Sequence, residues 1–414
     1  MSANSTTKEL KPGYIKIHRA VVTNAKSERV DVSGLIVELN FYESIFSPFI
    51  TGSLTLADAN ALDSMLPFFG NELLAFDIEG PSYDTDKRAT RAGLFHIYKM
   101  GSKENATTKA KIYTLYFQSI EATVDLNRSI SRTLRGKIST TVKTLAENPE
   151  FLDCTKPIIV EDTVNNEIHT SNFWSPVKNI YYLAERALNG SQNPSFTFFE
   201  NNEGFVFASL DTLASNDPVA TFYRDQNNVN VTDSSYATIL DMNNPVVFDY
   251  IDRVRTGYYG GMTYHYEVES RRLNKRTLRP IVDVKKVFLN NTNADVGYDS
   301  FKQEANVTHG FAHNSLYSVN PKLPIDHEMK RSYLLSSMSS QRTNIQVFGK
   351  LEYTAGQVVE LIVYIDAPVY GETPQEFITD KFASGRYLIT AINHSITKSG
   401  HISNIELCKD SIIS

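Results

Sequence analysis

Alternation of apolar and polar residues marks both ends of this 414-residue chain and predicts β-strands there. Near the start, Phe49–Leu56 alternates in this way and stops at Asp58. Near the end, Gly385–Ser395 and Ile402–Asp410 read as two strands joined by a turn over Lys398–His401. Because an unpaired edge strand promotes aggregation, such a terminal hairpin is expected to complete a sheet. The pattern favours a structural β-protein.

The region from Gly13 to about Asp125 is expected to form six or so short strands. The β-rich runs, separated by turn residues, cover 30–41, 49–56, 73–78, 94–99 and 112–120. A short helical turn over 62–66, ended by Pro67, interrupts them. Short antiparallel strands in this number are typical of a barrel or a sandwich. We therefore predict a first β-domain over residues 13–126.

A helical period then replaces the alternation. Leu134, Ile138, Val142 and Leu145 recur at helical spacing and predict an amphipathic helix over residues 131–146.

A second helix is predicted from Ser175 to Gly190, because Ser175 is a suitable N-cap and Pro176 suits the first helical position. Its buried face is expected to hold Val177, Ile180, Leu183 and Ala184. Strands over 196–199 and 205–210, joined by a turn over 200–204, predict a hairpin after it. Residues 127–206 are therefore expected to form an α/β insert.

Strand patterns return in the C-terminal part. They cover 246–249, 262–268, 343–348, 358–365, 386–392 and 402–408, with a helical turn over 332–338 and a loop over 290–299. We predict a second β-domain built from 211–270 and 332–411, a second insert over 271–331, and a flexible N-terminal segment over 1–12. The fold class is mainly β with α/β inserts. No short-period repeat is visible, but the layout suggests two related barrels.

Composition narrows the function. The net charge of −6 argues against nucleic-acid binding driven by phosphate contacts. No stretch approaches the roughly 20 apolar residues of a membrane-spanning helix, so no stable membrane insertion is expected. Met1–Pro12 lacks a secretory signal, which indicates synthesis in the cytoplasm. Cys154 and Cys408 are interpreted as two buried thiols rather than a disulfide or a metal site.

Standard catalytic motifs are missing from the sequence. Gly257–Gly261 is interpreted as a strand bend or bulge rather than a phosphate loop. His309 and His313, four residues apart, would share one face of a helix and could bind a metal. Gly310 disfavours that helix, so an exposed polar loop is the preferred interpretation.

Other polar residues also have structural interpretations. His96 and His394 lie inside strands and are expected to be hydrogen-bonded. Asp58 and Asp63 flank a turn, where aspartate is a natural cap, and Glu72 is expected to make hydrogen bonds at the end of a strand. One basic cluster is interpreted as a solvated face rather than a nucleic-acid patch: Arg271, Arg272, Lys275, Arg276 and Arg279. We assign no catalytic, cofactor-binding or metal-binding residue and no cofactor.

Three blocks together resemble the central baseplate hub proteins of contractile-tailed bacteriophages. The first is Ile50–Asp58 with Leu66–Leu74, the second is Phe173–Pro176 with the hairpin over 196–210, and the third is the Gly385 hairpin with His394. The resemblance spans most of residues 13–410 and is weakest over 271–330.

The resemblance implies two tail-tube-like antiparallel β-barrels plus two insert domains in each chain. It further implies a homotrimer whose six barrels join the six-fold tail tube to the three-fold central spike, without enzymatic activity. The expected partners are a separate spike protein, since the chain stops at Ser414 just after the last barrel, a tail tube or tube-initiator protein, and surrounding baseplate proteins. DNA would be a partner only in transit. The expected location is the tail baseplate of the virion.

Two alternatives remain. A tail-associated cell-wall hydrolase would need two carboxylates held in a cleft, and no pair stands out in the sequence. A receptor- or carbohydrate-binding tail protein would be expected to have a repetitive or coiled C-terminus, which is absent.

Overall fold

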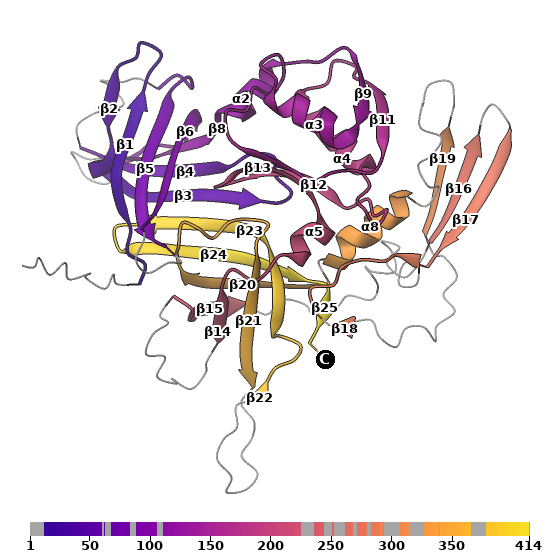
Figure 1. Ribbon diagram of the computed structural model, residues 1–414. Helices are drawn as coiled ribbons and strands as arrows, with labels where there is room; N and C mark the ends of the chain where they lie inside the picture. The colour runs from indigo at the N-terminus through magenta and orange to yellow at the C-terminus, as the bar shows by residue number, and fades with distance from the viewer. Residues whose placement is uncertain are drawn as a thin grey trace, which may run out of the picture.

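The computed structural model describes residues 12–59, 62, 68–82, 88–105, 111–224, 236–243, 251, 261–267, 271–279, 283–290, 292–293, 307–313, 327–338, 340–365 and 378–413. Within these residues the protein is mainly β, as the sequence predicts, and a 15-stranded sheet organises it (Figure 1). None of the helices in the described part of the chain has the length and apolarity needed to span a lipid bilayer.

The large sheet draws strands from both ends of the chain. Along its main path the strands are β15 (Ile239–Asn243), β20 (Gln341–Phe348), β24 (Gly400–Lys409), β23 (Gly385–Thr397), β3 (Ile36–Ser44), β4 (Thr51–Asp58), β8 (Lys111–Ser119), β6 (Arg88–Met100), β5 (Leu73–Pro81), β1 (Lys16–Thr23) and β2 (Arg29–Asp31). Beside this path lie β14 (Thr221–Arg224), β21 (Val358–Ile365), β22 (Ile378–Thr379) and β7 (Glu104–Asn105).

The terminal hairpin forms as predicted and lies in the middle of the sheet. Strands β23 and β24 pair through to Thr397 and Gly400, so Lys398 and Ser399 form the turn. Gly400 adopts φ +146°, which a side chain would disfavour. The hairpin is flanked by β20 on one side and β3 on the other. It therefore joins the two ends of the chain into one sheet.

The two halves of the sheet repeat one strand order. In the first half, β3, β4, β8, β6 and β5 are successive antiparallel neighbours. In the second half, β15, β20, β24, β23 and β21 are successive antiparallel neighbours in the same chain order. We call these sets the first and second repeat. Each has its own apolar core, around Phe41 and Phe117 in the first and around Ile345 and Leu407 in the second.

The insert between the repeats has two small sheets and a third core. One sheet has the order β10 (Ile158–Val160), β13 (Gly204–Ser209) and β12 (Phe196–Asn201), and the other pairs β11 (Asn166–Thr170) with β9 (Thr133–Lys137). The helices here are α2 (Ile120–Asn127), α3 (Ile138–Glu147), α4 (Pro176–Arg186) and α5 (Leu210–Ser215). Helices α3 and α4 contribute Val142 and Leu183 to the core.

The helix predicted over 131–146 is wrong in its first half. Residues 133–137 form strand β9, and α3 begins only at Ile138. Gly136 has φ +130°, a value that a right-handed helix cannot contain. Leu134 is only partly buried against the core and pairs with His169 of β11. It is therefore an apolar residue of a strand and not of the predicted helix.

The predicted helix after Ser175 is confirmed. The Ser175 Oγ accepts a hydrogen bond from the Lys178 N–H at 3.3 Å, and Pro176 occupies the first turn. The helix ends at Arg186, before the expected stop at Gly190. The Asn165 side chain explains the early end, because it donates to the Arg186 carbonyl and accepts from Leu188 N–H.

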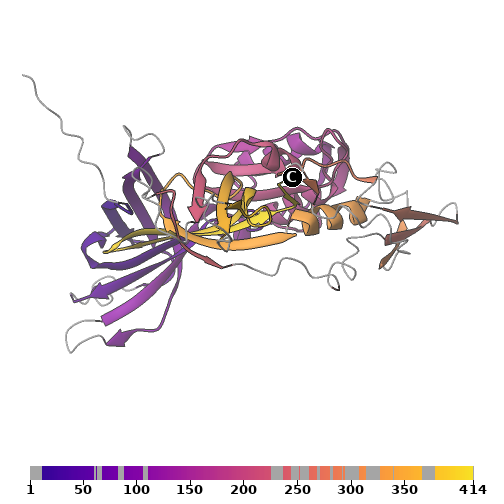
Figure 2. The same ribbon diagram turned by 90° about the horizontal axis from the view of Figure 1, so that it is seen from below.

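A separate three-stranded sheet lies at the far end of the molecule from β1 and β2 (Figures 1 and 2). Its order is β17 (Arg272–Leu278), β16 (Gly261–Glu267) and β19 (Val307–His313). This differs from the expected boundary at residue 270, because β16 pairs with β17 and β19 and not with the second repeat.

Other differences are local. Strand β18 (Thr292–Asn293) lies inside the expected loop and pairs with β25 (Ser411–Ile412), and the expected helical turn at 332–338 is the longer α8 (His327–Met338). Strand β1 and the short helix η1 (Ser33–Leu35) were not predicted. The strand expected at 246–249 and most of the turn expected at 62–66 lie outside the described residues.

Candidate functional site

The carboxylates singled out in the sequence serve local structure. Glu72 accepts hydrogen bonds from the Phe69 and Gly70 N–H groups at 2.7 and 2.9 Å, as expected for the end of a strand. Asp58 is buried and accepts a hydrogen bond of 3.4 Å from the Tyr113 hydroxyl. No cluster of three histidine, cysteine or acidic residues suited to a metal occurs in the described part of the chain. Asp63 lies outside it.

His96 and His394 are hydrogen-bonded, as predicted. The His96 Nδ1 lies 3.0 Å from the Thr123 hydroxyl. The His394 Nδ1 lies 3.0 Å from His401 Nε2, and its Nε2 lies 2.9 Å from the Tyr353 carbonyl. Burial holds the pKa of His394 well below its usual range and lowers the pKa of His401 to about 3. Both imidazoles are therefore neutral under ordinary conditions.

The remaining sequence candidates are also placed. His309 and His313 lie on strand β19, so the expected polar loop is wrong. The basic cluster falls on and beside β17, whose residues are exposed up to Thr277. Cys154 and Cys408 are free thiols, the second buried and the first partly buried. Gly257–Gly260 lie outside the described residues, and Gly261 begins β16.

The most extensive polar feature is one face of the large sheet, opposite the two apolar cores. Directly paired residues of an antiparallel sheet point to the same side, so the strand register defines rows across this face. One row crosses eight strands and both repeats: Asp241, Gln346, Asn404, Asn393, Tyr42, Thr51, Gln118 and His96. This row, which we call the amide row, contains one carboxylate and no lysine or arginine.

The neighbouring row is also polar where β23, β3 and β4 lie side by side. Ser395 of β23 lies opposite Asn40 of β3, which in turn lies opposite Ser53 of β4. The Asn40 side chain donates to the Ser53 hydroxyl at 3.3 Å, and the Gln346 side chain donates to the Asn404 Oδ1 at 3.0 Å. These contacts hold amide and hydroxyl groups in fixed positions on the sheet.

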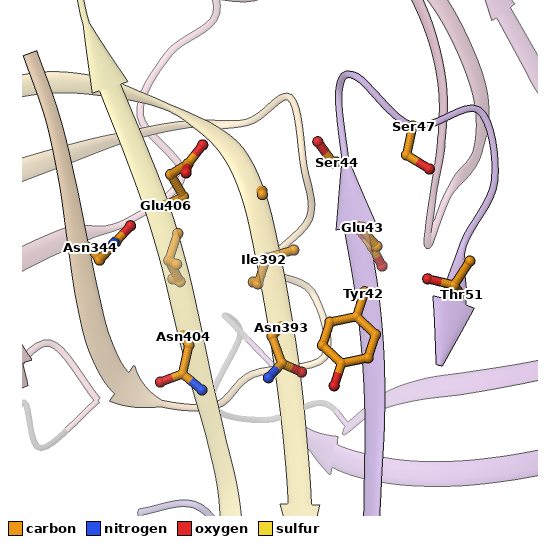
Figure 3. A pocket seen from close by; sticks show the side chains of 12 residues that line it. Tyr42, Glu43, Ser44, Ser47, Thr51, Asn344, Ile392, Asn393, Asn404 and Glu406 are labelled. Carbon is orange, nitrogen blue, oxygen red and sulfur yellow. The ribbon is translucent and has the colours of Figure 1, made fainter. Parts of the chain in front are cut away.

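The two repeats meet where β23 pairs with β3, and the polar face is hollowed there. The hollow measures about 310 Å³ and is lined by residues of β3, β20, β23 and β24, by Ser47 of the turn before β4 and by Thr51 of β4. Figure 3 shows Tyr42, Asn393 and Asn404 side by side on three adjacent strands. The Asn393 Oδ1 is buried and has no hydrogen-bond partner. Besides amide and hydroxyl groups, the lining of the hollow includes two carboxylic residues, Glu43 and Glu406.

Two partly buried ion pairs connect the insert with the first repeat. Lys156 bridges Glu121 and Glu200 at 2.9 and 2.5 Å. Glu200 also accepts a hydrogen bond from the Ile50 N–H at 2.9 Å, which ties the insert to the first repeat. Burial raises the pKa of Glu200, and Lys156 opposes that rise.

The sequence analysis missed the amide row. Each member occupies a solvent-side position of an alternating strand, where charged residues are common. The sequence did contain one signal of this row, because such positions hold uncharged polar residues in place of charged ones. Asn393, Ser395 and Thr397 along β23 are examples.

Comparison with known proteins concerns the fold. No family model and no curated protein matches the chain. The tail protein from Neisseria meningitidis MC58 is similar in structure, with a TM-score of 0.55 and 11% identity over 95% of this chain and 96% of that chain. The 43 kDa tail protein of prophage MuSo2 from Shewanella oneidensis is similar with a TM-score of 0.56 and 11% identity over 95% of this chain and 99% of that chain. The protein described here therefore shares the fold of these tail proteins, in agreement with the resemblance found in its sequence.

Proposed function

We propose that the protein is a structural protein of a phage tail and acts as the central hub of the baseplate. The observation that carries this proposal is the amide row, which crosses the joint between the two repeats without a break. A sheet face of this kind suits the wall of a channel. The shared fold with tail proteins supports the same assignment.

In this proposal three chains form a ring. Each chain supplies two repeats of one strand order, so three chains supply six similar units, and a three-fold assembly can meet a six-fold tube. The ring would bind a spike protein on one side, a tail tube or tube-initiator protein on the other, and baseplate proteins around it. It has no catalytic role, and its place is the tail of the virion.

The chemistry of the amide row suits a passage for DNA. Phosphate groups bind mainly to lysine and arginine, and this row has neither. Amide and hydroxyl groups keep the wall hydrated without adding a strong field of either sign. DNA can then pass through the ring without being held.

Light scattering on the purified chain tests the ring. We expect a mass three times the 46.6 kDa of one chain. A stable monomer or dimer at the highest soluble concentration contradicts the proposal.

Lysine substitutions test the role of the amide row. The triple variant Gln346→Lys, Asn404→Lys and Asn393→Lys should retain duplex DNA in a filter-binding assay at low salt, whereas the unmodified ring should not. The matched control places three lysines on exposed sites outside the large sheet, Thr133→Lys, Thr140→Lys and Thr277→Lys. Equal retention by the control and the triple variant, or by the unmodified protein, contradicts a channel role for this face.

A further inference from the structure

The two repeats share the same irregularities of strand pairing. The pairing of β6 with β8 is interrupted between Ile97 and Lys99, and the pairing of β23 with β24 is interrupted between Ile389 and Ala391. In both repeats, the residue before the interruption donates its N–H to a backbone carbonyl just before the neighbouring strand of the sheet. That strand is β5 in the first repeat and β21 in the second. Ile97 donates to the Glu72 carbonyl at 2.9 Å, and Ile389 donates to the Gln357 carbonyl at 2.8 Å. Strand β6 of the first repeat is therefore the counterpart of β23.

Strand β15 is the counterpart of β3 by the same reasoning. The pairing of β3 with β4 is interrupted at Val37, and the pairing of β15 with β20 is interrupted at Leu240. The residues match as well, since Ile36–Asn40 reads Ile-Val-Glu-Leu-Asn and Ile239–Asn243 reads Ile-Leu-Asp-Met-Asn. A β-bulge at the same point of the same short sequence aligns Asn40 with Asn243.

Within the chain, the repeats are joined by β23 and β3. Residues Ala391–Thr397 of β23 have β24 on one edge and β3 on the other, and Ser395 lies opposite Asn40. The counterparts of these two strands, β6 and β15, stand at the two ends of the eight strands that the amide row crosses. The joint between the repeats thus uses the first strand of one repeat, β3, and the fourth strand of the other, β23.

The counterpart edges carry no strand in the described part of the chain. Strand β5 pairs with β6 only as far as His96. Beyond His96, the rest of β6 and the following strand β7 pair only with β8 among the described residues. At the other end of the path, Thr238 just before β15 bridges Tyr223 of β14, and among the described residues Ile239–Asn243 of β15 pair with β20 alone. Open edges of this kind are templates for another strand.

We infer that these two edges pair with each other between copies of the chain, in the register of the internal joint. This inference rests on the proposed ring and names its contact. Phe117 and Leu407 lie opposite the counterparts Ile97 and Ile389, so Ile112 and Ile402, each five residues earlier, are also counterparts. Glu104 lies opposite Ile112 and Ser395 lies opposite Ile402, which makes Glu104 the counterpart of Ser395, although the first repeat has one more residue before this point. Because Ser395 faces Asn40, Glu104 of one copy faces Asn243 of the next.

The side chains at this contact are compatible. Glu104 and Asn243 are both exposed within one chain, and an asparagine amide can donate to a carboxylate. The contact is heterologous, because β6 with β7 on one copy meets β15 on another. Such a contact closes into a ring when successive rotations sum to a full turn. Repetition of the internal joint supplies that rotation.

Paired cysteines test the register. In a Cys154→Ser background, Glu104→Cys with Asn243→Cys should form disulfides between chains on mild oxidation. Non-reducing electrophoresis should then show a ladder that ends at the trimer. Opposite residues of antiparallel strands bring their Cβ atoms close enough for a disulfide, so the reaction needs no backbone movement.

Two further pairs make the result specific. Asn40→Cys with Ser395→Cys reproduces the internal joint and should close within one chain, which shows that the geometry permits a disulfide. Glu104→Cys with Met242→Cys is shifted by one residue, so the second thiol points to the core side and no ladder should form.

The possible outcomes distinguish the inferred contact between chains from the proposed trimeric ring. A trimer that shows no ladder for Glu104 with Asn243, while the internal pair closes, overturns the joint and leaves the ring standing. A ladder of equal strength for the shifted pair also overturns the joint. A chain that stays monomeric at its highest soluble concentration overturns both.

Discussion

Arg91 and Glu43 form an ion pair of 2.7 Å in the interior, where their side chains are 4% and 0% exposed. Glu43 also accepts a hydrogen bond of 3.3 Å from the Ala355 N–H, and the Arg91 guanidinium lies 4.4 Å from the centre of the Phe41 ring. Burial raises the pKa of Glu43, and Arg91 opposes that rise. The pair therefore ties β3 and β6 of the first repeat to the turn that leads into β21 of the second.

Removal of only one member of the Arg91–Glu43 ion pair should destabilise the folded protein. Arg91→Met leaves a buried carboxylate without its cation, and we expect the free energy of unfolding to fall by about 3–5 kcal/mol. The double variant Arg91→Met with Glu43→Leu removes both charges and should recover most of that loss. Urea unfolding at neutral pH measures both. A single variant within about 1 kcal/mol of the parent would show that the pair contributes little.

Acid should destabilise the protein through His394 and His401. Both pKa values are lowered in the folded state by burial, and the Arg91 cation adds to the effect. Unfolded histidine binds a proton below about pH 6.5, whereas these two stay neutral when folded. Stability is therefore full above about pH 6.5 and is lost as the pH falls towards 3, by about 1.4 kcal/mol per pH unit for each histidine.

The variant His401→Gln isolates this effect. It removes one of the two groups, so the slope of unfolding free energy against pH between 6 and 4 should fall by about 1.4 kcal/mol per pH unit relative to the parent. Comparison of slopes cancels any uniform loss of stability caused by the substitution. An unchanged slope would mean that His401 is protonated in the folded protein as readily as in the unfolded one.

Truncation of the buried face of α4 should also be costly. Leu183 is 1% exposed and belongs to the core of the insert, so Leu183→Ala should lower the free energy of unfolding by about 2–5 kcal/mol. Leu126 on α2 is 79% exposed, and Leu126→Ala is the matched control, with an expected change within about 0.5 kcal/mol. Thermal unfolding followed by circular dichroism measures both. Similar small changes for the two variants would show that the insert can refill the space at Leu183.

Local signals predicted local structure well. The Ser175 cap and Pro176 located α4, and the alternation around a glycine-containing turn located β23 and β24. Strand β9 was missed because Leu134 fits a helical period with α3, and only the backbone angle of Gly136 shows that the helix cannot extend through it.

Local sequence signals could not predict the pairing of strands that are far apart in sequence. The joint of β3 with β23 depends on a register between residues far apart in sequence, and no local pattern encodes it. The match between Ile36–Asn40 and Ile239–Asn243 was present in the sequence. It covers five residues with conservative replacements, and it becomes evidence of a repeat only when both strands carry a bulge at the second residue. The amide row likewise becomes visible only once the register aligns its residues.

The repeat also predicts how the fold tolerates substitution of Glu72, one of the acidic residues singled out in the sequence. Its Oε1 accepts the Phe69 N–H at 2.7 Å, and in the second repeat the Gln357 Oε1 accepts the Thr354 N–H at 3.1 Å with the same spacing of three residues. A glutamine therefore already performs this hydrogen-bonding role in the fold. Glu72→Gln should change the free energy of unfolding by less than about 1 kcal/mol, whereas Glu72→Ala removes two hydrogen bonds of about 0.5–1.5 kcal/mol each and should cost about 1–3 kcal/mol.

The same variants decide between a structural protein and a cell-wall hydrolase. If the chain only assembles, a peptidoglycan turbidity assay should show no clearing by the parent protein, by Glu72→Gln or by Asp58→Asn, and light scattering should give the same mass for all three. A hydrolase that uses either carboxylate would clear the suspension and lose that activity in one of the two conservative variants while its fold remained intact. Clearing by the parent that disappears in Glu72→Gln would contradict the purely structural role, because the glutamine at the equivalent position of the second repeat shows that the fold itself does not need a carboxylate there.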